Sequence, residues 1–250
     1  MRARLFVWVS MALALLAAGP VASQSRFDGW GAAIVAGDWR DPYDRPIQAF
    51  DNARRDLTRA FQTAGFARAD MVDYSLRPDV AALVTAQAAS EGMAEVFART
   101  SRGCFVYITS HGSPAGIVFG PDVTVNPTML ANSLRSWCGA RPTVVILSAC
   151  FSGIFVDGLA APNRMILTAA RRDRSSFGCG PEETYPYFDA CILESLPGAA
   201  DFLALAAATR ACVNRRETEE GLTPASEPQL FVGSEMQLRL PTLRFSRPAG

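Results

Sequence analysis

The sequence predicts an α/β protein in which helices cover both faces of a sheet with parallel central strands. Short β-branched or apolar runs alternate with longer segments of helical composition, which is the pattern of βαβ units. Two of the runs, FVYI and TVVIL, are apolar almost throughout, which is typical of central strands covered on both faces. In the first helical segment Phe50, Leu57 and Phe61 recur at seven- and four-residue spacing, the stripe expected of a helix that packs on a sheet.

Six strands are expected, each a short apolar run bounded by glycine, proline or polar clusters. They are residues 32–36, 71–74, 104–109, 143–148, 165–168 and 229–232. Five helices are expected between them, where the composition is helical. They are residues 47–64, 90–100, 127–137, 188–195 and 199–216. The polar segment ETEEGLTPASEP at residues 217–228 is expected to form an exposed loop before the last strand.

The composition excludes several classes of protein. Of the 250 residues, 49% are apolar, and 24 basic side chains balance 24 acidic ones, so a sizeable core can form and a nucleic-acid partner is not expected. All 24 basic residues are arginine, and the absence of lysine excludes Schiff-base and P-loop chemistry. His111 is the single histidine, which excludes metal sites built from two or three histidines.

The first 23 residues have the three-part layout of a secretory signal peptide. Residues 1–4 contain two arginines, residues 5–18 are an apolar run, and residues 19–23 end in small side chains. The apolar run is shorter than the roughly 20 residues that span a bilayer, and no cysteine follows it directly to carry a lipid. We therefore expect residues 1–23 to be removed and residues 24–250 to form one exported domain, periplasmic or secreted, without a membrane anchor.

Two reactive side chains follow consecutive predicted strands. The third strand runs into His111 and the fourth into Cys150, so both lie at carboxyl ends of strands, where open α/β sheets bind their ligands. An ordinary thiol is mostly protonated at neutral pH, and an imidazole is a base that can activate it. The N–H groups of Gly112 and Cys150 are candidate donors to an oxyanion, since a glycine has no Cβ in the way. The alternatives are a cysteine that only fills the core and a histidine that is only solvated.

Three motifs along the chain resemble those of a known peptidase family. They are Ile108-Thr-Ser-His-Gly followed by Gly116-Ile-Val-Phe, then Val145-Ile-Leu-Ser-Ala-Cys-Phe-Ser-Gly, then Thr168-Ala-Ala followed by Ser175-Ser-Phe-Gly-Cys. In this order they resemble the legumain family of cysteine peptidases, the asparaginyl endopeptidases of peptidase family C13 in the caspase-like clan. The resemblance covers roughly residues 30 to 200.

The resemblance implies a caspase-like three-layer sandwich, with a six-stranded, mainly parallel sheet and helices on both faces. It also implies that the chain hydrolyses a protein or peptide substrate through an acyl-enzyme. Cys150 would be the nucleophile, His111 the general acid and base, and Gly112 a contributor to the oxyanion hole. No metal or organic cofactor is implied. A non-catalytic binding module on a peptidase scaffold is the alternative, and the intact cysteine and histidine argue against it.

The resemblance further implies cleavage after Asn, and less readily after Asp. An Asn side chain presents both an acceptor and a donor, so its pocket needs groups of both kinds. The candidate substrate-binding residues are Arg45, Ser148, Ser175, Ser176 and Asp189. Family members carry acidic residues where this chain has Ser148 and Phe151. If Arg45 and Asp189 both line the pocket, Asn is preferred; if Arg45 points away, Asp189 alone favours Arg or Lys. We favour Asn.

Six cysteines in an exported chain indicate disulfide bonds. They are Cys104, Cys138, Cys150, Cys179, Cys191 and Cys212. A bond between Cys104 and Cys138 is expected, because the first starts the third strand and the second ends the helix before the fourth, at the same sheet edge. Cys150 is expected to be free, and the pairing of the other three stays open. The lack of a Cys-x-x-Cys motif argues against a thiol-disulfide protein.

Overall fold

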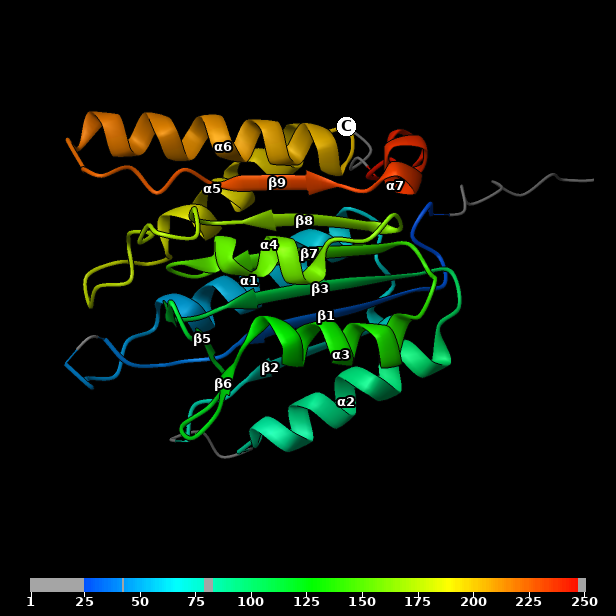
Figure 1. The fold of residues 1–250 in the computed structure, drawn as a ribbon, viewed down its shortest axis with the longest axis horizontal. Helices are drawn as coiled ribbons and strands as arrows, with labels where there is room; N and C mark the ends of the chain where they lie inside the picture. Colours follow the sequence, from blue (N-terminus) through cyan, green and yellow to red (C-terminus); the bar gives the residue numbers. More distant parts are fainter. Residues whose placement is uncertain (1–24, 42, 79–82, 247–250) are drawn as a thin grey trace, which may run out of the picture.

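The fold is a six-stranded sheet between two layers of helices (Figure 1). The computed structural model describes residues 25–41, 43–78 and 83–246, and the predicted signal segment lies outside them. The strand order is β2-β1-β3-β7-β8-β9. The strands are β1 (Trp30–Ala36), β2 (Met71–Ser75), β3 (Gly103–Thr109), β7 (Thr143–Ser148), β8 (Arg164–Thr168) and β9 (Gln229–Val232). All neighbours are parallel except β8 and β9, so the sheet is mainly parallel, as predicted.

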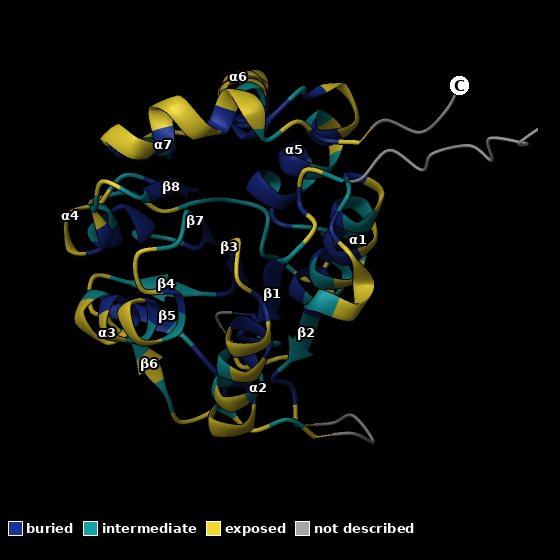
Figure 2. Ribbon diagram, turned by 90° about the vertical axis from the view of Figure 1, so that its right-hand side faces the viewer, coloured by how far each residue is buried: buried dark blue, intermediate teal, exposed yellow. Residues whose placement is uncertain are grey.

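Helices cover both faces of the sheet (Figure 2). One face carries α1 (Ala49–Thr63), α5 (Tyr187–Ser195) and α6 (Phe202–Glu219). The other carries α2 (Ala86–Arg99), α3 (Pro127–Cys138) and α4 (Phe155–Leu159). The predicted three-layer sandwich is therefore confirmed. Of the helices in the described ranges, none is both long and apolar enough to cross a membrane.

Burial on both faces explains why the central strands are almost wholly apolar. In β3, Phe105 and Tyr107 belong to the core under α1, α5 and α6. Val106 and Ile108, which alternate with them, belong to the core under α2 and α3. Successive side chains of a strand point to opposite faces, so a strand covered on both sides needs apolar residues at nearly every position.

The elements that the sequence analysis missed are short. Residues 112–125 contain β4 (Gly112–Ser113), β5 (Gly116–Val118) and β6 (Thr124–Val125), which form a second, three-stranded sheet. The helices α4 and α7 (Ser234–Arg239) have five and six residues. Elements of this length give no measurable period in the sequence, so pattern analysis cannot detect them.

The expectation of an exposed loop at residues 217–228 is confirmed for residues 220–228, most of which are exposed, and is wrong for residues 217–219. Helix α6 continues to Glu219, and the side chain of Glu217 is buried. Its carboxylate accepts a hydrogen bond from the N–H of Ser226 at 3.1 Å. An acidic residue was mistaken for a solvated one because its partner is a backbone group, which leaves no pattern in the sequence.

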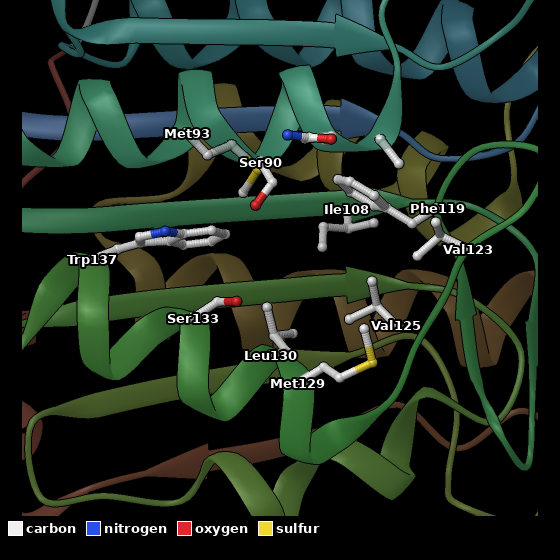
Figure 3. Close-up of a pocket in the computed structure, with 12 residues that line it drawn as sticks. Ser90, Met93, Ile108, Phe119, Val123, Val125, Met129, Leu130, Ser133 and Trp137 are labelled. Atoms are coloured by element: carbon white, nitrogen blue, oxygen red, sulfur yellow. The ribbon is translucent and has the colours of Figure 1, made fainter.

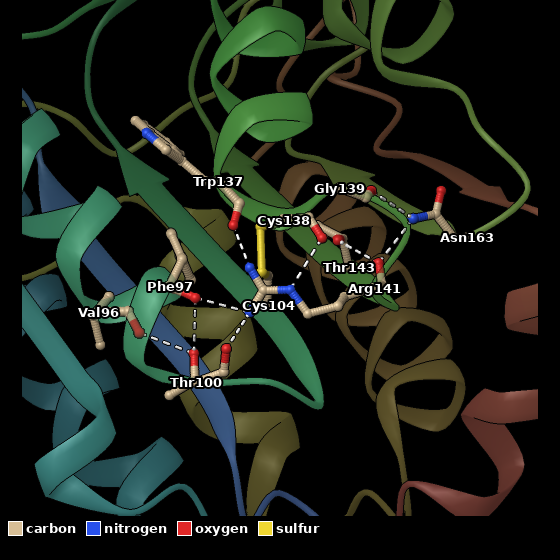
Figure 4. The surroundings of a disulfide bond; sticks show 10 residues. All are labelled: Val96, Phe97, Thr100, Cys104, Trp137, Cys138, Gly139, Arg141, Thr143 and Asn163. Carbon is tan, nitrogen blue, oxygen red and sulfur yellow. Dashed lines mark hydrogen bonds between the residues drawn. A yellow bond between two sulfur atoms is a disulfide. The ribbon is translucent and has the colours of Figure 1, made fainter.

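Two disulfide bonds join the described cysteines. The predicted bond between Cys104 and Cys138 is present (Figure 4), and a second bond joins Cys191 in α5 to Cys212 in α6. Cys150 is free, as predicted, and Cys179 is the other free thiol among the described residues.

Arg141 caps two helices beside the first disulfide bond (Figure 4). Its guanidinium donates to the carbonyl oxygens of Phe97 at 2.8 Å, Thr100 at 2.5 Å, Cys138 at 3.0 Å, and Trp137. These carbonyls lie at the ends of α2 and α3, where no further helical N–H is available to them. One side chain therefore ties both helices to the strand that follows it.

Aromatic and backbone contacts bring the two ends of the described chain together. Phe27, just before β1, lies 5.6 Å from Phe245 between ring centroids. The hydroxyl of Ser25 and the N–H of Ser246 donate to the carbonyl oxygens of residues 65 and 64, at 2.6 and 2.8 Å. Both ends are thus fixed to the same turn after α1.

Candidate active site

The carboxyl ends of β3 and β7 bring His111 and Cys150 to one edge of the sheet. The two strands are parallel neighbours with Thr109 opposite Ser148. The N–H of Ser110 donates to the Ser148 carbonyl at 3.0 Å, so the pairing continues past the strand end. His111 lies two positions after Thr109, and Cys150 lies two positions after Ser148. Both reactive residues therefore follow the paired strand ends at the same edge of the sheet.

The loop after β8 holds the turn that carries the Cys150 thiol. The N–H of Ser176 donates to Cys150 Sγ at 3.3 Å, and its hydroxyl lies 3.6 Å from the same sulfur; Ser175 beside it is exposed. Phe151 has a left-handed backbone, with φ of 57°, and its N–H donates to the carbonyl of Arg174 at 2.7 Å. The turn is therefore held from two sides, and the thiol is partly exposed.

The orientation of the His111 ring is set by a backbone carbonyl and an aromatic ring. Nε2 lies 2.6 Å from the carbonyl oxygen of Arg40. A carbonyl oxygen can only accept, so Nε2 carries the proton of the neutral ring and Nδ1 is the basic nitrogen. Phe50 packs edge-to-face on the imidazole, with centroids 5.0 Å apart. The ring is thus held with one nitrogen able to take up a proton.

Gly112 allows the histidine turn and the cysteine turn to touch. A Cβ at this position would collide with the carbonyl oxygen of Cys150. The N–H of Val118 donates to the carbonyl of His111 at 3.0 Å, and Gly112 pairs with Ile117. Along an antiparallel pair of strands, hydrogen-bonded residue pairs alternate with pairs that are not hydrogen-bonded. His111 and Val118 form a hydrogen-bonded pair, so the next pair, Gly112 and Ile117, is not bonded and the Gly112 N–H points away from β5. This N–H is free to bind another acceptor.

Asp189 lies buried beneath the paired ends of β3 and β7. Its carboxylate accepts hydrogen bonds from the hydroxyls of Tyr107, Thr109 at 2.5 Å, and Ser148, instead of capping α5. Its side chain has no exposed surface, and this burial raises the pKa of Asp189 to about 6, although the three hydrogen bonds act to lower it. The structure thus joins Asp189 to Ser148 in one polar cluster.

We expect Asp189→Asn to remove a pH-dependent loss of stability. The pKa of this carboxyl is raised to about 6 in the folded protein from its ordinary 3.8, so the unfolded chain releases its proton first and the folded state loses stability as pH rises between these values. The full change is about 3 kcal/mol, and it is absent in the amide variant. Urea unfolding measures it: relative to wild type, the variant gains stability as pH rises through this window. A constant difference contradicts the prediction.

The structure does not join Arg45 to this cluster. Arg45 lies on the loop between β1 and α1, and its guanidinium pairs with the buried Asp41 carboxylate at 2.6 Å. It also lies over the ring of Tyr43, at 5.3 Å from the centroid, and its side chain is 61% exposed. Among the described residues, no hydrogen bond or ion pair connects Arg45 with Asp189.

Tyr107 and Thr109 belong to the site although the sequence analysis did not single them out. They are two positions apart on β3, so they face the same side of the sheet. Hydroxyl groups at this spacing in an otherwise apolar strand were the available signal. Their partner, Asp189, comes from a helix about 80 positions later in the chain, which the strand sequence does not reveal.

An apolar cavity of about 250 Å³ lies elsewhere, between α2 and α3 (Figure 3). It is lined by twelve residues, including Met93, Ile108, Phe119, Leu130 and Trp137. None of the predicted site residues lines it, so it is separate from the edge that carries the thiol and the imidazole. In the part of the chain that the structure describes, no cluster of three or more His, Cys, Asp or Glu side chains could hold a metal ion.

Comparisons with known proteins agree with this fold. The chain is similar in fold to caspase-1 from Spodoptera frugiperda, with a TM-score of 0.60 at 14% identity, over 84% of this chain and 87% of the caspase chain. A family model described as the Peptidase C13 family matches residues 66–200, more than half of the chain. A search of curated proteins finds no match.

The caspase-like sandwich and this family match define the class of caspase-like cysteine peptidases. Within that class, the chain belongs to the peptidase C13 family. The resemblance to the legumain family that the sequence motifs indicated is therefore confirmed.

Proposed function

We propose that the chain is an exported endopeptidase that cuts peptide bonds through an acyl-enzyme on Cys150, with His111 as general acid and base. The observation that carries this proposal is the pairing of β3 with β7, which places the two residues at one sheet edge. The contact between Gly112 and the Cys150 backbone supports the same assignment.

The predicted signal segment and the two disulfide bonds support export, to a periplasm or outside the cell. The six-stranded sheet, which includes both the first strand, β1, and the last strand, β9, supports a single domain over residues 24–250.

The proposed reaction begins with proton transfer from the Cys150 thiol to Nδ1 of His111, since Nε2 is already bound to a carbonyl. The thiolate attacks the carbonyl carbon of the scissile bond and forms a tetrahedral oxyanion. Collapse expels the amine, which takes the proton from His111. Water then hydrolyses the thioester by the same steps, with His111 acting again as base.

The oxyanion is assigned to the N–H groups of Gly112 and Cys150. The Gly112 N–H points away from β5 and is not used by the hairpin. The N–H of Phe151 is not available, because it donates to the Arg174 carbonyl. Fixed donors of this kind stabilise the charge that develops in the transition state and need no reorganisation.

We propose Asn as the preferred residue before the cut. The cluster of Asp189 with the hydroxyls of Tyr107, Thr109 and Ser148 is buried, and its hydroxyls already donate to the carboxylate, so it would have to open toward the substrate to offer a carboxamide its oxygen acceptors. A carboxylate that already accepts hydrogen bonds from three hydroxyls is a weaker counter-ion for a guanidinium than one with free lone pairs. Arg45 lies on the same loop as Arg40, whose carbonyl contacts His111. In this proposal Arg45 completes the pocket when the bound substrate replaces Asp41 as its partner. Cleavage after Arg or Lys is the alternative if Arg45 stays on Asp41.

A set of fluorogenic peptides that differ only in the residue before the cut tests the proposal. We expect cleavage after Asn to exceed cleavage after Gln by roughly 10²-fold, because the longer side chain cannot reach the same partners. Cleavage after Asp should be weaker than after Asn, and Asp189→Ala should abolish the Asn preference. Cleavage after Arg that exceeds cleavage after Asn, and that collapses in Asp189→Ala, decides for the basic alternative. No cleavage of any peptide favours the binding module.

A further inference from the structure

A second free thiol lies close to the proposed nucleophile. Of the six cysteines, four are paired, and Cys150 and Cys179 are the free thiols of the described chain. Export places both in a compartment where thiols are readily oxidised. An unpaired cysteine beside a reactive one is therefore a feature with chemical consequences.

The loop that contacts Cys150 also carries Cys179. Ser176, three positions before Cys179, donates to the Cys150 sulfur at 3.3 Å. Cys179 packs against the small cluster that includes Ile47 and Phe50. Phe50 in turn packs on the imidazole of His111. Cys179 therefore lies in the wall of the proposed active site, behind the residues that would react.

The segment around Cys179 has the freedom that a disulfide bond would require. The N–H of Ser176 lies 3.3 Å from Cys150 Sγ, and the three residues from Ser176 to Cys179 span at most about 10 Å. The segment must therefore move until the Cα atoms of Cys150 and Cys179 are about 4.4–6.8 Å apart, as in a disulfide bond. The open space lies on the far side of Cys179, where a Cβ at Gly180 would meet nothing within 4 Å, whereas Gly178, with φ of 84°, is packed against Tyr187. The N–H of Tyr187 anchors the carbonyl of Phe177 at 3.0 Å, so movement is confined to the segment that carries the thiol.

We propose that Cys179 is a resolving cysteine, which forms a reversible disulfide bond with Cys150 when a peroxide oxidises the nucleophile. This inference rests on the proposed function, because it needs Cys150 as the reactive thiolate. In the first step the thiolate attacks hydrogen peroxide, the O–O bond breaks, and Cys150 becomes a sulfenic acid while hydroxide leaves. In the second step the Cys179 sulfur attacks the Cys150 sulfur, the S–O bond breaks, and the thiol proton leaves with the hydroxyl as water.

The electrostatics of the pair suit this division of roles. Burial, and then the neighbouring charge of Cys150, raise the pKa of Cys179 to about 11. Cys179 therefore stays a thiol at neutral pH and does not compete with Cys150 for peroxide or substrate. Conversion of Cys150 to a neutral sulfenic acid removes the second of these causes, so Cys179 becomes more reactive at the step in which it is needed.

The consequence is protection of the nucleophile. Without a resolving thiol, a sulfenic acid is oxidised onward to sulfinic and sulfonic acids, which dithiols do not reduce. The disulfide bond stops this sequence, and a dithiol reductant restores both thiols. The peptidase would then be switched off by peroxide and switched on by reductant.

Peroxide treatment of the purified chain, with Cys179→Ser as matched variant, tests the proposal. One half of each sample is digested without reduction for mass spectrometry, and the other half is treated with dithiothreitol and assayed on the best peptide. Cys150→Ser controls for bonds that do not involve the nucleophile. The activity of each variant before oxidation is its own reference, and recovery is expressed as a fraction of that value.

We expect oxidised wild type to yield peptides linked between Cys150 and Cys179 and to regain nearly all its activity with dithiothreitol. Cys179→Ser should give no such link, carry Cys150 as sulfinic acid, and regain essentially no activity. Absence of the link in oxidised wild type, or full recovery of Cys179→Ser, overturns the proposal. The link is measured by mass and so does not depend on activity. A wild type that forms the link but is inactive both before oxidation and after reduction contradicts the peptidase and not this inference. A wild type that is active before oxidation but forms no link contradicts this inference and not the peptidase.

Discussion

Cys150→Ala is expected to lower kcat/KM on the best peptide by about 10⁴-fold or more, because the acyl-enzyme cannot form without the thiol. The fold should be unchanged, since the side chain is partly exposed and the turn is held by backbone groups. Peptide hydrolysis and circular dichroism measure the two effects. Ser133→Ala, which changes a residue of the separate apolar cavity, is the control and should stay active. Residual activity near wild type in Cys150→Ala would remove the peptidase assignment.

His111→Ala is expected to cause a loss of the same order, since the chain has no other imidazole to accept the thiol proton. His111→Gln separates the chemical role from a positional one. Its amide can still donate to the Arg40 carbonyl that now holds Nε2, but it cannot act as a base. Both variants should therefore be equally inactive in peptide hydrolysis. Substantial activity in His111→Gln alone would show that the ring only positions the loop.

The sequence predicted the large elements because their signals are long or strongly apolar. The first and last residues of β7 and β9 agree with the prediction. Both strands are short runs bounded by residues that interrupt secondary structure. Helix α6 was placed three residues too early at each end, and its C-terminal turn was mistaken for loop. Glu217 is the reason: it belongs to the helix and is buried, yet it resembles a solvated charge in the sequence.

Whether a residue of the candidate site could be predicted from the sequence depended on which groups it contacts in the fold. His111 and Cys150 could be predicted because each ends an apolar strand, and such ends meet at one edge. The contact that orients the His111 ring could not be predicted, because its partner is the backbone carbonyl of Arg40 and every residue has such a carbonyl. The partners of Asp189 could not be predicted either, since they depend on how α5 crosses the ends of β3 and β7.

The meeting of the two described ends has a practical consequence for engineering this chain. Residues 25 and 246 are both tied to the turn at residues 64 and 65, and Phe27 lies against Phe245. A short peptide linker could therefore connect them without crossing the molecule, which is the condition for circular permutation. New termini could then be opened in the exposed turn at Gly139 and Ala140, between α3 and β7. Because β7 starts three residues after this turn and Cys150 follows its carboxyl end, such a permutant would leave the reactive edge uncut.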